Sequence, residues 1–94
     1  TSYSNVEIFP SPFRVPTATP LTIEGLMDGS SCKIMTLTGR VLKTIESRPD
    51  VEGYQAFWDG RDATGDWVST GVYLIALYTK NGSSSFEKIA VIRN

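Results

Sequence analysis

The sequence predicts an all-β fold, arranged as an antiparallel β-sandwich of about seven strands. Apolar and polar residues alternate along short segments, and no segment of helical length repeats apolar residues at i, i+3 and i+4. Glycine, proline and asparagine punctuate these segments at the spacing of turns. The 94 residues suit a single domain with one core. Many short strands in such a length are typical of an immunoglobulin-like sandwich, and an open barrel is the competing architecture.

Seven segments have the pattern of strands. They are residues 6–9, 21–25, 32–37, 40–47, 54–58, 71–79 and 85–93. The sixth segment, GVYLIALYT, is apolar at nearly every position, as expected of a central strand covered on both faces or of a strand in a sandwich. In the third segment, Cys32 and Ile34 lie on the side expected to face the core. A lone cysteine in such a run is expected to be a small core residue rather than a nucleophile.

Proline marks the expected interruptions in the first half of the chain. The first strand is expected to stop at PSPF, because Pro10 and Pro12 have no amide hydrogen and favour extended or turn geometry. The proline-rich stretch at residues 14–20 and the segment RPDVEG at 48–53 are expected to be loops.

Two glycine-containing pairs predict tight hairpins. Thr38 and Gly39 are expected to form a two-residue turn, in which glycine supplies the positive φ that such turns need. Asn81 and Gly82 are a pair typical of a type I′ turn, which would join the sixth strand to the last one.

Composition excludes several classes of function. The formal charge is −1 and the nine lysines and arginines are scattered, so nucleic acid is not an expected partner. With one cysteine and no histidine, the chain has no internal disulfide and no zinc site built from several Cys and His. No histidine is available to activate a serine, so we expect no enzyme activity and no cofactor.

Neither a membrane-spanning helix nor an N-terminal export signal is expected within these residues. No apolar run approaches the roughly 20 residues that cross a bilayer as a helix. Its first residues, TSYSNVEIFP, lack the basic and apolar regions of an export signal. If the domain is exported, we expect the signal to lie elsewhere in a longer parent chain.

The segment FWDGRDATGDWVSTGVY, residues 57–73, invites two interpretations. As a calcium loop, it would supply the carboxylates of Asp59, Asp62 and Asp66 to a hard cation. The spacing does not fit an EF-hand, because Arg61 stands where a second acidic ligand belongs and no glutamate occupies the twelfth position.

We favour the second interpretation, in which this segment is a structural corner. Trp58 is expected to anchor in the core, and Asp59 with Gly60 is expected to open a turn whose carboxylate accepts backbone N–H bonds. Arg61 would then pair with a nearby carboxylate or carbonyl, and Trp67 would cover the flank of the sandwich.

Carbohydrate chemistry offers weaker alternatives. Paired carboxylates serve glycosidases, but a domain of this size offers no evident cleft that would separate their pKa values. Tyr73 and Tyr78 could line a sugar-binding face, although tyrosines on a central strand are more often core or interface residues.

Five motifs in order resemble the immunoglobulin-like C-terminal domain of type IX secretion system cargo in Bacteroidetes. They are PSPF at 10–13, IEGL at 23–26, IMTLTGRVLKT at 34–44, FWDGRDATGDWVSTGVYLI at 57–75 and KIAVIR at 88–93. A related domain of the flagellar hook-capping protein has a similar pattern around WDG. Within the secretion family, the sequence looks most like the last domain of PorZ-like two-propeller proteins. The resemblance covers almost the entire chain.

The resemblance implies a domain that works by being recognised. In such proteins, a non-enzymatic C-terminal domain of a longer exported chain directs the folded cargo from the periplasm across the outer membrane to the cell surface. Its partners are the translocon and the surface sortase or attachment complex. One alternative is a retained module of a PorZ-like attachment-complex component that contacts anionic lipopolysaccharide or the sortase. A passive spacer is a third hypothesis.

The resemblance also implies a set of recognition residues. They are Pro10, Pro12, Phe13, Thr38, Gly39, Gly71, Val72, Tyr73, Lys88, Ile89, Val91 and Arg93. Ser11 replaces the asparagine that is usual in the first motif. Each of these residues has an alternative role in maintaining the fold.

The last strand is expected to be an end strand with unpaired backbone groups, which suits recognition by strand addition. Lys88 and Arg93 would then contact an acidic translocon surface or a lipopolysaccharide phosphate. Exposed strand edges also make a homodimer formed by exchange of terminal strands an alternative.

Overall fold

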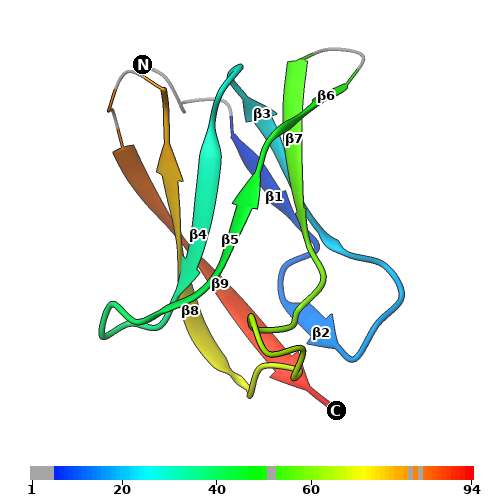
Figure 1. Cartoon of the computed structure of the whole chain (residues 1–94). Helices are drawn as coiled ribbons and strands as arrows, with labels where there is room; N and C mark the ends of the chain where they lie inside the picture. Colours follow the sequence, from blue (N-terminus) through cyan, green and yellow to red (C-terminus); the bar gives the residue numbers. More distant parts are fainter. Residues whose placement is uncertain (1–5, 51–52, 81, 83) are drawn as a thin grey trace.

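A computed structural model describes residues 6–50, 53–80, 82 and 84–94. It is all-β, with two sheets that face each other as an immunoglobulin-like sandwich (Figure 1), which confirms the predicted fold class. The strands are β1 (Glu7–Phe9), β2 (Phe13–Val15), β3 (Leu21–Leu26), β4 (Ser31–Met35), β5 (Val41–Glu46), β6 (Arg48–Asp50), β7 (Gly53–Trp58), β8 (Gly71–Tyr78) and β9 (Ser84–Arg93). Among the described residues, no helix is long and apolar enough to cross a membrane.

The four-stranded sheet has the order β1-β3-β7-β6, and the five-stranded sheet has the order β2-β9-β8-β4-β5. β8 lies between β9 and β4, so it is a central strand of a sandwich, but it is not covered on both faces, because Val72 is 44% exposed on its outer side. Its side chains Tyr73, Ile75 and Leu77 point into the core, and Ala76 is buried on the opposite face.

Two strands were missed by the sequence prediction, which placed loops over both. β2 lies between prolines and has only three residues, so its alternation is too short to detect. β6 contains Pro49, but it is an edge strand, where a missing amide hydrogen need not break a ladder. Both strands depend on pairing with residues that are distant or weakly patterned in the sequence.

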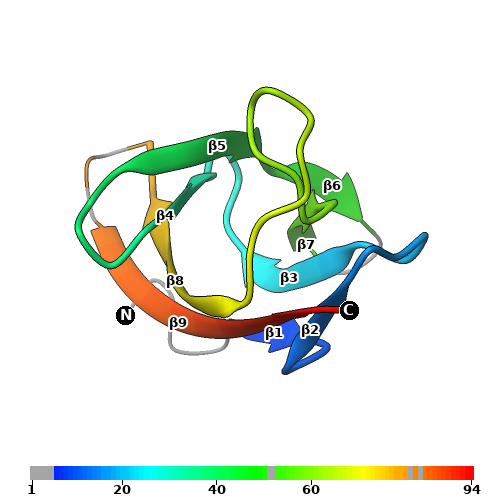
Figure 2. The ribbon, with the colours of Figure 1, turned by 90° about the horizontal axis from the view of Figure 1, so that it is seen from below.

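The chain changes sheets twice within nearly continuous extended segments. β1 pairs with β3 in one sheet, and β2 pairs with β9 in the other, with residues 10–12 between them. β5 and β6 make the opposite change around Ser47, whose N–H donates to the Ser30 carbonyl at 3.1 Å. Figure 2 shows the two transitions on opposite sides of the sandwich. Each one joins the two sheets covalently at an edge.

One strand pair departs from the antiparallel prediction. β2 runs parallel to β9, with Phe13 beside Val91, Arg14 beside Ile92 and Val15 beside Arg93. All other pairs between the named strands are antiparallel. The parallel pair arises because the N-terminal segment has already changed sheets when it reaches the C-terminal strand.

The core lies between the sheets. Its fully buried members include the side chains of Phe13, Leu21, Ile23, Trp58 and Ile75. Cys32 and Ile34 have no exposed surface, so the side predicted for them is correct. Burial raises the pKa of the Cys32 thiol to about 12, and the negative charge of Glu46 adds to this effect.

The β4–β5 turn differs from the prediction of a two-residue turn at Thr38 and Gly39. The N–H of Gly39 donates to the Thr36 carbonyl at 2.9 Å, so Leu37 and Thr38 are the central residues of the turn. The N–H of Thr36 donates to the Arg40 carbonyl at 2.9 Å and closes a three-residue loop. Gly39 follows the turn with a φ of 96°, the position where such loops favour glycine.

The predicted pair at the β8–β9 turn falls partly outside the described residues, because Asn81 is not among them. Gly82 has a φ of 96°, and its N–H donates to the Thr79 carbonyl at 3.1 Å. β8 and β9 then pair in register from Gly71 with Val91 to Tyr78 with Ser84. The predicted hairpin between these two strands is therefore confirmed.

Candidate functional site

The C-terminal end of β9 brings together residues from three of the sequence motifs. Val91 lies between Phe13 on β2 and Gly71 on β8. One step back along the inward side of β9, Ile89 lies beside Tyr73 of β8. Residues far apart in the sequence thus form one continuous patch of the five-stranded sheet.

Aromatic side chains hold this patch to the other sheet. The ring centroids of Phe13 and Trp58 are 5.7 Å apart, and those of Trp58 and Tyr73 are 6.4 Å apart. The Tyr73 hydroxyl donates to the Ser69 carbonyl at 2.6 Å, which satisfies its polar end. Such aromatic contacts contribute about 0.5–1.5 kcal/mol each beyond their area of burial.

Two hydrogen bonds fix the end of the chain. The N–H of Arg93 donates to the Thr70 hydroxyl at 2.9 Å, and the N–H of Asn94 donates to the Val15 carbonyl at 2.8 Å. We call the contacts of β2, β8 and residues 58–70 around residues 89–94 the C-terminal clamp.

The clamp corrects the prediction that the last strand is an end strand throughout. Val91 of β9 has a partner on each side, Gly71 of β8 and Phe13 of β2, and Ile92 and Arg93 pair with β2. Pro12 has no amide hydrogen, so the segment before Phe13 cannot extend the β2 ladder in the same way. Within the described part of the chain, residues 84–90 pair only with β8, and they leave an open edge.

The proposed recognition residues divide into two groups by exposure. Phe13, Tyr73, Ile89 and Val91 are buried, and Gly71 is half-buried. The exposed residues are Pro10, Pro12, Thr38, Gly39, Val72, Lys88 and Arg93. The first group packs the clamp, whereas the second is available on the surface of the folded domain. The exposed group is spread over a kink, a turn, the outer side of the five-stranded sheet and the end of β9.

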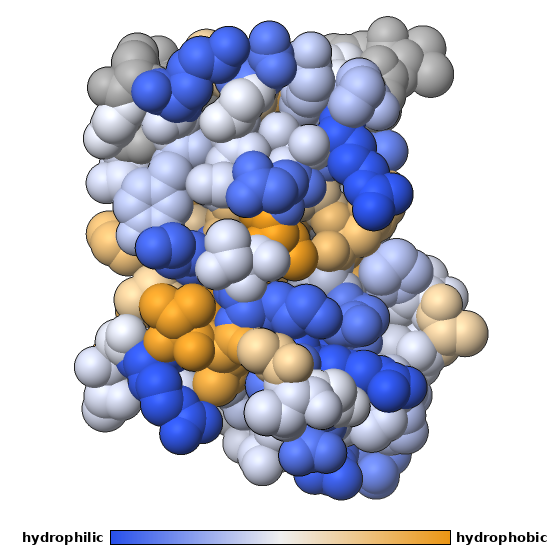
Figure 3. Space-filling view, in the orientation of Figure 1, coloured by the Kyte–Doolittle hydropathy of each residue, from blue (hydrophilic) through white to orange (hydrophobic). Residues whose placement is uncertain are grey.

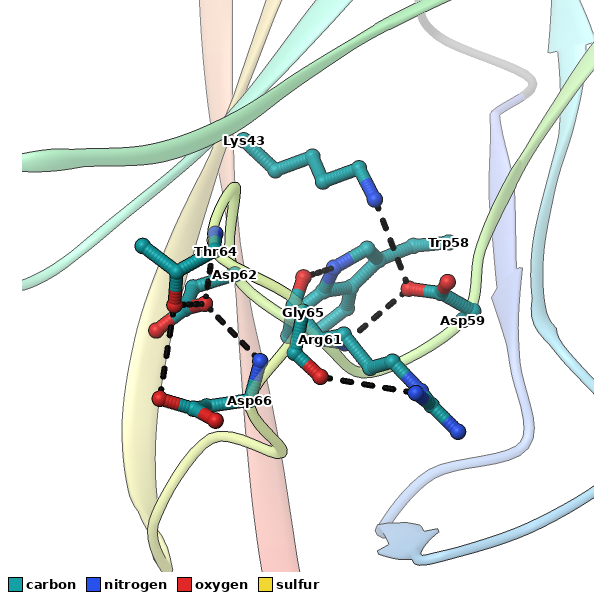
Figure 4. Close-up of polar contacts among 8 residues, drawn as sticks. All are labelled: Lys43, Trp58, Asp59, Arg61, Asp62, Thr64, Gly65 and Asp66. Atoms are coloured by element: carbon teal, nitrogen blue, oxygen red, sulfur yellow. Dashed lines mark hydrogen bonds and ion pairs between the residues drawn. The ribbon is translucent and has the colours of Figure 1, made fainter.

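The segment after β7 forms a compact corner (Figure 4). Asp59 Oδ1 accepts the N–H of Arg61 at 3.0 Å and lies 3.8 Å from Lys43 Nζ. The indole Nε1 of Trp58 donates to the Arg61 carbonyl at 2.9 Å. The Arg61 guanidinium lies over the Trp67 ring, 4.2 Å from its centroid, and Nη1 donates to the Gly65 carbonyl at 3.4 Å.

Asp62 organises the second half of this corner. Its Oδ1 accepts the Thr64 hydroxyl at 2.6 Å, the Thr64 N–H at 2.9 Å and the Asp66 N–H at 3.1 Å. These bonds, led by the Thr64 hydroxyl, hold the pKa of the Asp62 carboxyl below its usual value. The Thr64 hydroxyl also lies 3.3 Å from Asp66 Oδ2.

Gly60 connects the corner to the clamp. It has a φ of 88°, and a Cβ at this position would lie 2.6 Å from Cγ1 of Val15 and 3.2 Å from Phe13. Only glycine lets the corner backbone approach β2 this closely. The corner therefore packs directly against the strand that covers the end of β9.

The structure also bears on the metal-binding and sugar-binding interpretations of the sequence. Among the described residues, no group of three carboxylates or thiols is placed to hold a metal ion. Asp59 and Asp62 instead accept N–H groups of their own loop. Tyr73 and Tyr78 do not form a common sugar-binding face, because alternate positions along β8 point to opposite sides of the sheet. Tyr73 is in the core. On the outer side of the sheet, the Tyr78 ring centroid lies 5.4 Å from Lys33 Nζ.

A surface depression separates the corner from the β4–β5 turn. Two adjoining hollows of about 140 and 300 Å³ share Arg40, Leu42 and Asp62 in their walls. Figure 3 shows apolar side chains gathered beside this turn, at the start of β5. The exposed apolar residues there are Leu37 and Val41.

Sequence reasoning missed the residues through which β2 acts. Val15 is fully buried, and the Thr70 hydroxyl accepts the N–H of Arg93, yet neither residue was among the predicted recognition residues. The alternation of Phe13, Arg14 and Val15 was the available signal. It is hidden because prolines flank it and its partner lies at the other end of the chain.

Fold and clamp together define an immunoglobulin-like domain whose last strand is held inside a sheet. No protein-family model and no curated protein matches the chain. A solved structure of PorZ does match, with a TM-score of 0.77 and 33% identity over 98% of this chain and 12% of the PorZ chain. PorZ is described as an essential bacterial surface component of the type-IX secretion system of Porphyromonas gingivalis. The chain is thus similar in sequence and fold to a small segment of PorZ.

A second structure shares the fold alone. CopC from Methylosinus trichosporium OB3b matches with a TM-score of 0.51 and 12% identity, over 96% of each chain.

Proposed function

We propose that this chain is a non-enzymatic signal domain, which directs a longer protein across the outer membrane through the type IX secretion system to the cell surface. The observation that carries this proposal is the 33% identity with a segment of PorZ over nearly the whole chain. The ordered motifs of the sequence support the same assignment, because they extend from the PSPF kink to the last strand.

The division of the motif residues explains how such a domain is read in its folded form. The buried residues maintain the clamp, and the exposed residues present backbone and charge to the translocon. Lys88 and Arg93 are exposed cations near the chain end, suited to an acidic surface. The machinery therefore recognises the surface of a sandwich rather than an unfolded tail.

The similarity to PorZ also favours a second candidate function. A retained domain of an attachment-complex component would stay on its parent chain and contact the sortase or anionic lipopolysaccharide. The same exposed cations would then bind phosphate groups. Exchange of terminal strands between two copies stays a prediction, and it would require β9 to leave both β2 and β8.

The primary test is the localisation of a reporter. Residues 1–94 are fused behind a periplasm-exported reporter in a Bacteroidetes host, with a matched strain that lacks a working type IX system. We expect the reporter at the surface or in the medium of the first strand only. Periplasmic retention of a folded fusion in both strains would reject the signal function.

Mass spectrometry of the mature surface protein separates the two candidates. A new C-terminus upstream of residue 6 identifies a cleaved signal, whereas an intact C-terminus identifies a retained module. Deleting the last strand is a poor test, because Ile89 and Val91 belong to the core and their loss would unfold the domain.

A further inference from the structure

The charged side chains on the outer face of the five-stranded sheet are mostly positive. Arg14 on β2, Lys33 on β4 and Lys88 on β9 point outward, because each is flanked along its strand by residues that face the core. Glu46 on β5 is the one acidic side chain that the register places on this face among the described residues. None of the three cations forms an ion pair with a described residue.

Apolar side chains lie between these cations. Phe86 is 56% exposed and lies beside Ala76, and Val72 is 44% exposed on the neighbouring strand. Leu74, between Lys88 on β9 and Met35 on β4, is half-buried. The outer face therefore combines exposed apolar area with a net positive charge, which suits a partner that is both apolar and acidic.

The open edge of β9 borders this face. β2 covers β9 only from Val91 onward, so residues 84–90 present backbone groups that no described strand pairs with. Unsatisfied groups at a strand edge favour pairing with another chain.

We propose that residues 84–90 bind an extended acidic segment of a partner protein by strand addition. This inference rests on the proposed function, for which it names the partner's chemistry. A strand added here lies in line with β2 and places its outward side chains beside Phe86 and Lys88. An apolar residue packs against Phe86, and an acidic residue two positions along pairs with Lys88.

The side chains along the β9 edge determine the register of the bound segment and which of its sides carries acidic residues. Glu87 lies between Phe86 and Lys88 and points to the other side of the sheet, where an acidic side chain of the partner would be repelled. The bound segment is therefore acidic on one side only. A lipid phosphate would use the cations, but it would leave the β9 backbone groups and Phe86 without partners, so a protein strand fits better.

The probe is the peptide VTETVTETV, which alternates valine and glutamate on one side and threonine on the other. Its matched controls are VTKTVTKTV and a form of the first peptide that is N-methylated at alternate residues. Binding is measured by fluorescence anisotropy, and amide hydrogen exchange in residues 84–90 locates the site. We expect the glutamate peptide to bind at least about tenfold more tightly than either control.

Two variants test whether the charge of Lys88 contributes to binding of the glutamate peptide. Lys88→Glu is expected to weaken binding of the glutamate peptide by about tenfold or more and to favour the lysine peptide. Arg48→Glu, an exposed change on the other sheet, is expected to leave binding unchanged. Equal binding of both charged peptides, or protection elsewhere than residues 84–90, would overturn the proposal. The proposal would also be overturned if Lys88→Glu weakened binding of the domain to anionic phospholipid vesicles but left its binding of the glutamate peptide unchanged.

The reporter fusion distinguishes the two levels of failure. If the wild-type fusion is secreted and Lys88→Glu with Phe86→Asp is secreted equally well, the proposed strand site is wrong and the signal function stands. If the folded wild-type fusion is not secreted in any strain, the signal function is wrong whatever the peptides do.

Discussion

Gly60 shows how one residue ties the corner to the clamp. Gly60→Ala and Gly65→Ala both place alanine at a positive φ, which costs about 1–2 kcal/mol. The added Cβ of Gly60→Ala would also lie 2.6 Å from Val15, whereas that of Gly65→Ala meets nothing within 4 Å. We therefore expect Gly60→Ala to be less stable than Gly65→Ala by about a further 1–3 kcal/mol in urea unfolding. Equal stability of the two variants would show that the corner does not press on β2.

Asp62 makes stability depend on pH. The pKa of its carboxyl is lowered in the folded state. The ionised form therefore stabilises the fold above the carboxyl pKa of the unfolded chain, which is about 3.9. This contribution is lost as the pH falls through the folded pKa. Asp62→Asn should therefore be less stable than wild type at pH 6, and the difference should shrink as the pH falls below about 4.

Urea unfolding at several pH values measures this difference. Thr64→Val removes the leading hydrogen-bond donor, so it should move the Asp62 pKa back toward its usual range in an NMR titration. A difference between wild type and Asp62→Asn that stays constant with pH would contradict the assignment.

Cys32 tests the closure of the core. The thiol has no exposed surface and its pKa is raised to about 12, so neither access nor ionisation favours reaction at pH 8. We expect a disulfide reagent to label the native protein only at the rate of unfolding and to label the denatured protein at once. Rapid labelling of the native state would contradict the packing around β4.

At the scale of the element, the packing of β2 keeps the C-terminal end of β9 in the five-stranded sheet. Phe13→Ala removes a fully packed ring of the clamp and should cost about 3–5 kcal/mol. Phe86→Ala, the matched change on the exposed side of β9, should alter stability by no more than about 0.5 kcal/mol. Denaturant unfolding of the two variants measures the difference, and similar losses would refute the clamp.

The elements that the sequence predicted are those with local signals. β8 was found because its apolar run is long, and the β8–β9 hairpin because glycine marks the turn. β2 and β6 were missed because three residues next to proline become strands only through pairing with distant partners. The β4–β5 turn was shifted by one residue, because the same Thr-Gly pair fits a two-residue or a three-residue loop.

The candidate site shows the same limit. The motifs located its residues, but only the structure separates Phe13 and Tyr73, which pack the clamp, from Lys88 and Val72, which face solvent. Alternation along β9 indicates which side chains face the core. It does not reveal that β2 covers the last three residues of this strand and leaves the preceding ones open.

At the scale of the whole molecule, the two changes of sheet explain why the motifs span the chain. The PSPF kink delivers β2 to β9, and the corner delivers β8 to the other side of β9. β2, from the first part of the chain, and β9, from its last part, therefore meet in one sheet. A signal read on this surface requires a folded domain.

The most direct test of this account compares two reporters in a Bacteroidetes host with a working type IX system. One carries residues 1–94, and the other carries an unrelated immunoglobulin-like sandwich of similar size. Only the first is expected to reach the cell surface, and circular dichroism is expected to show that both domains are folded. Surface display of both reporters, or of neither, would contradict the claim that this fold carries a secretion signal on its surface.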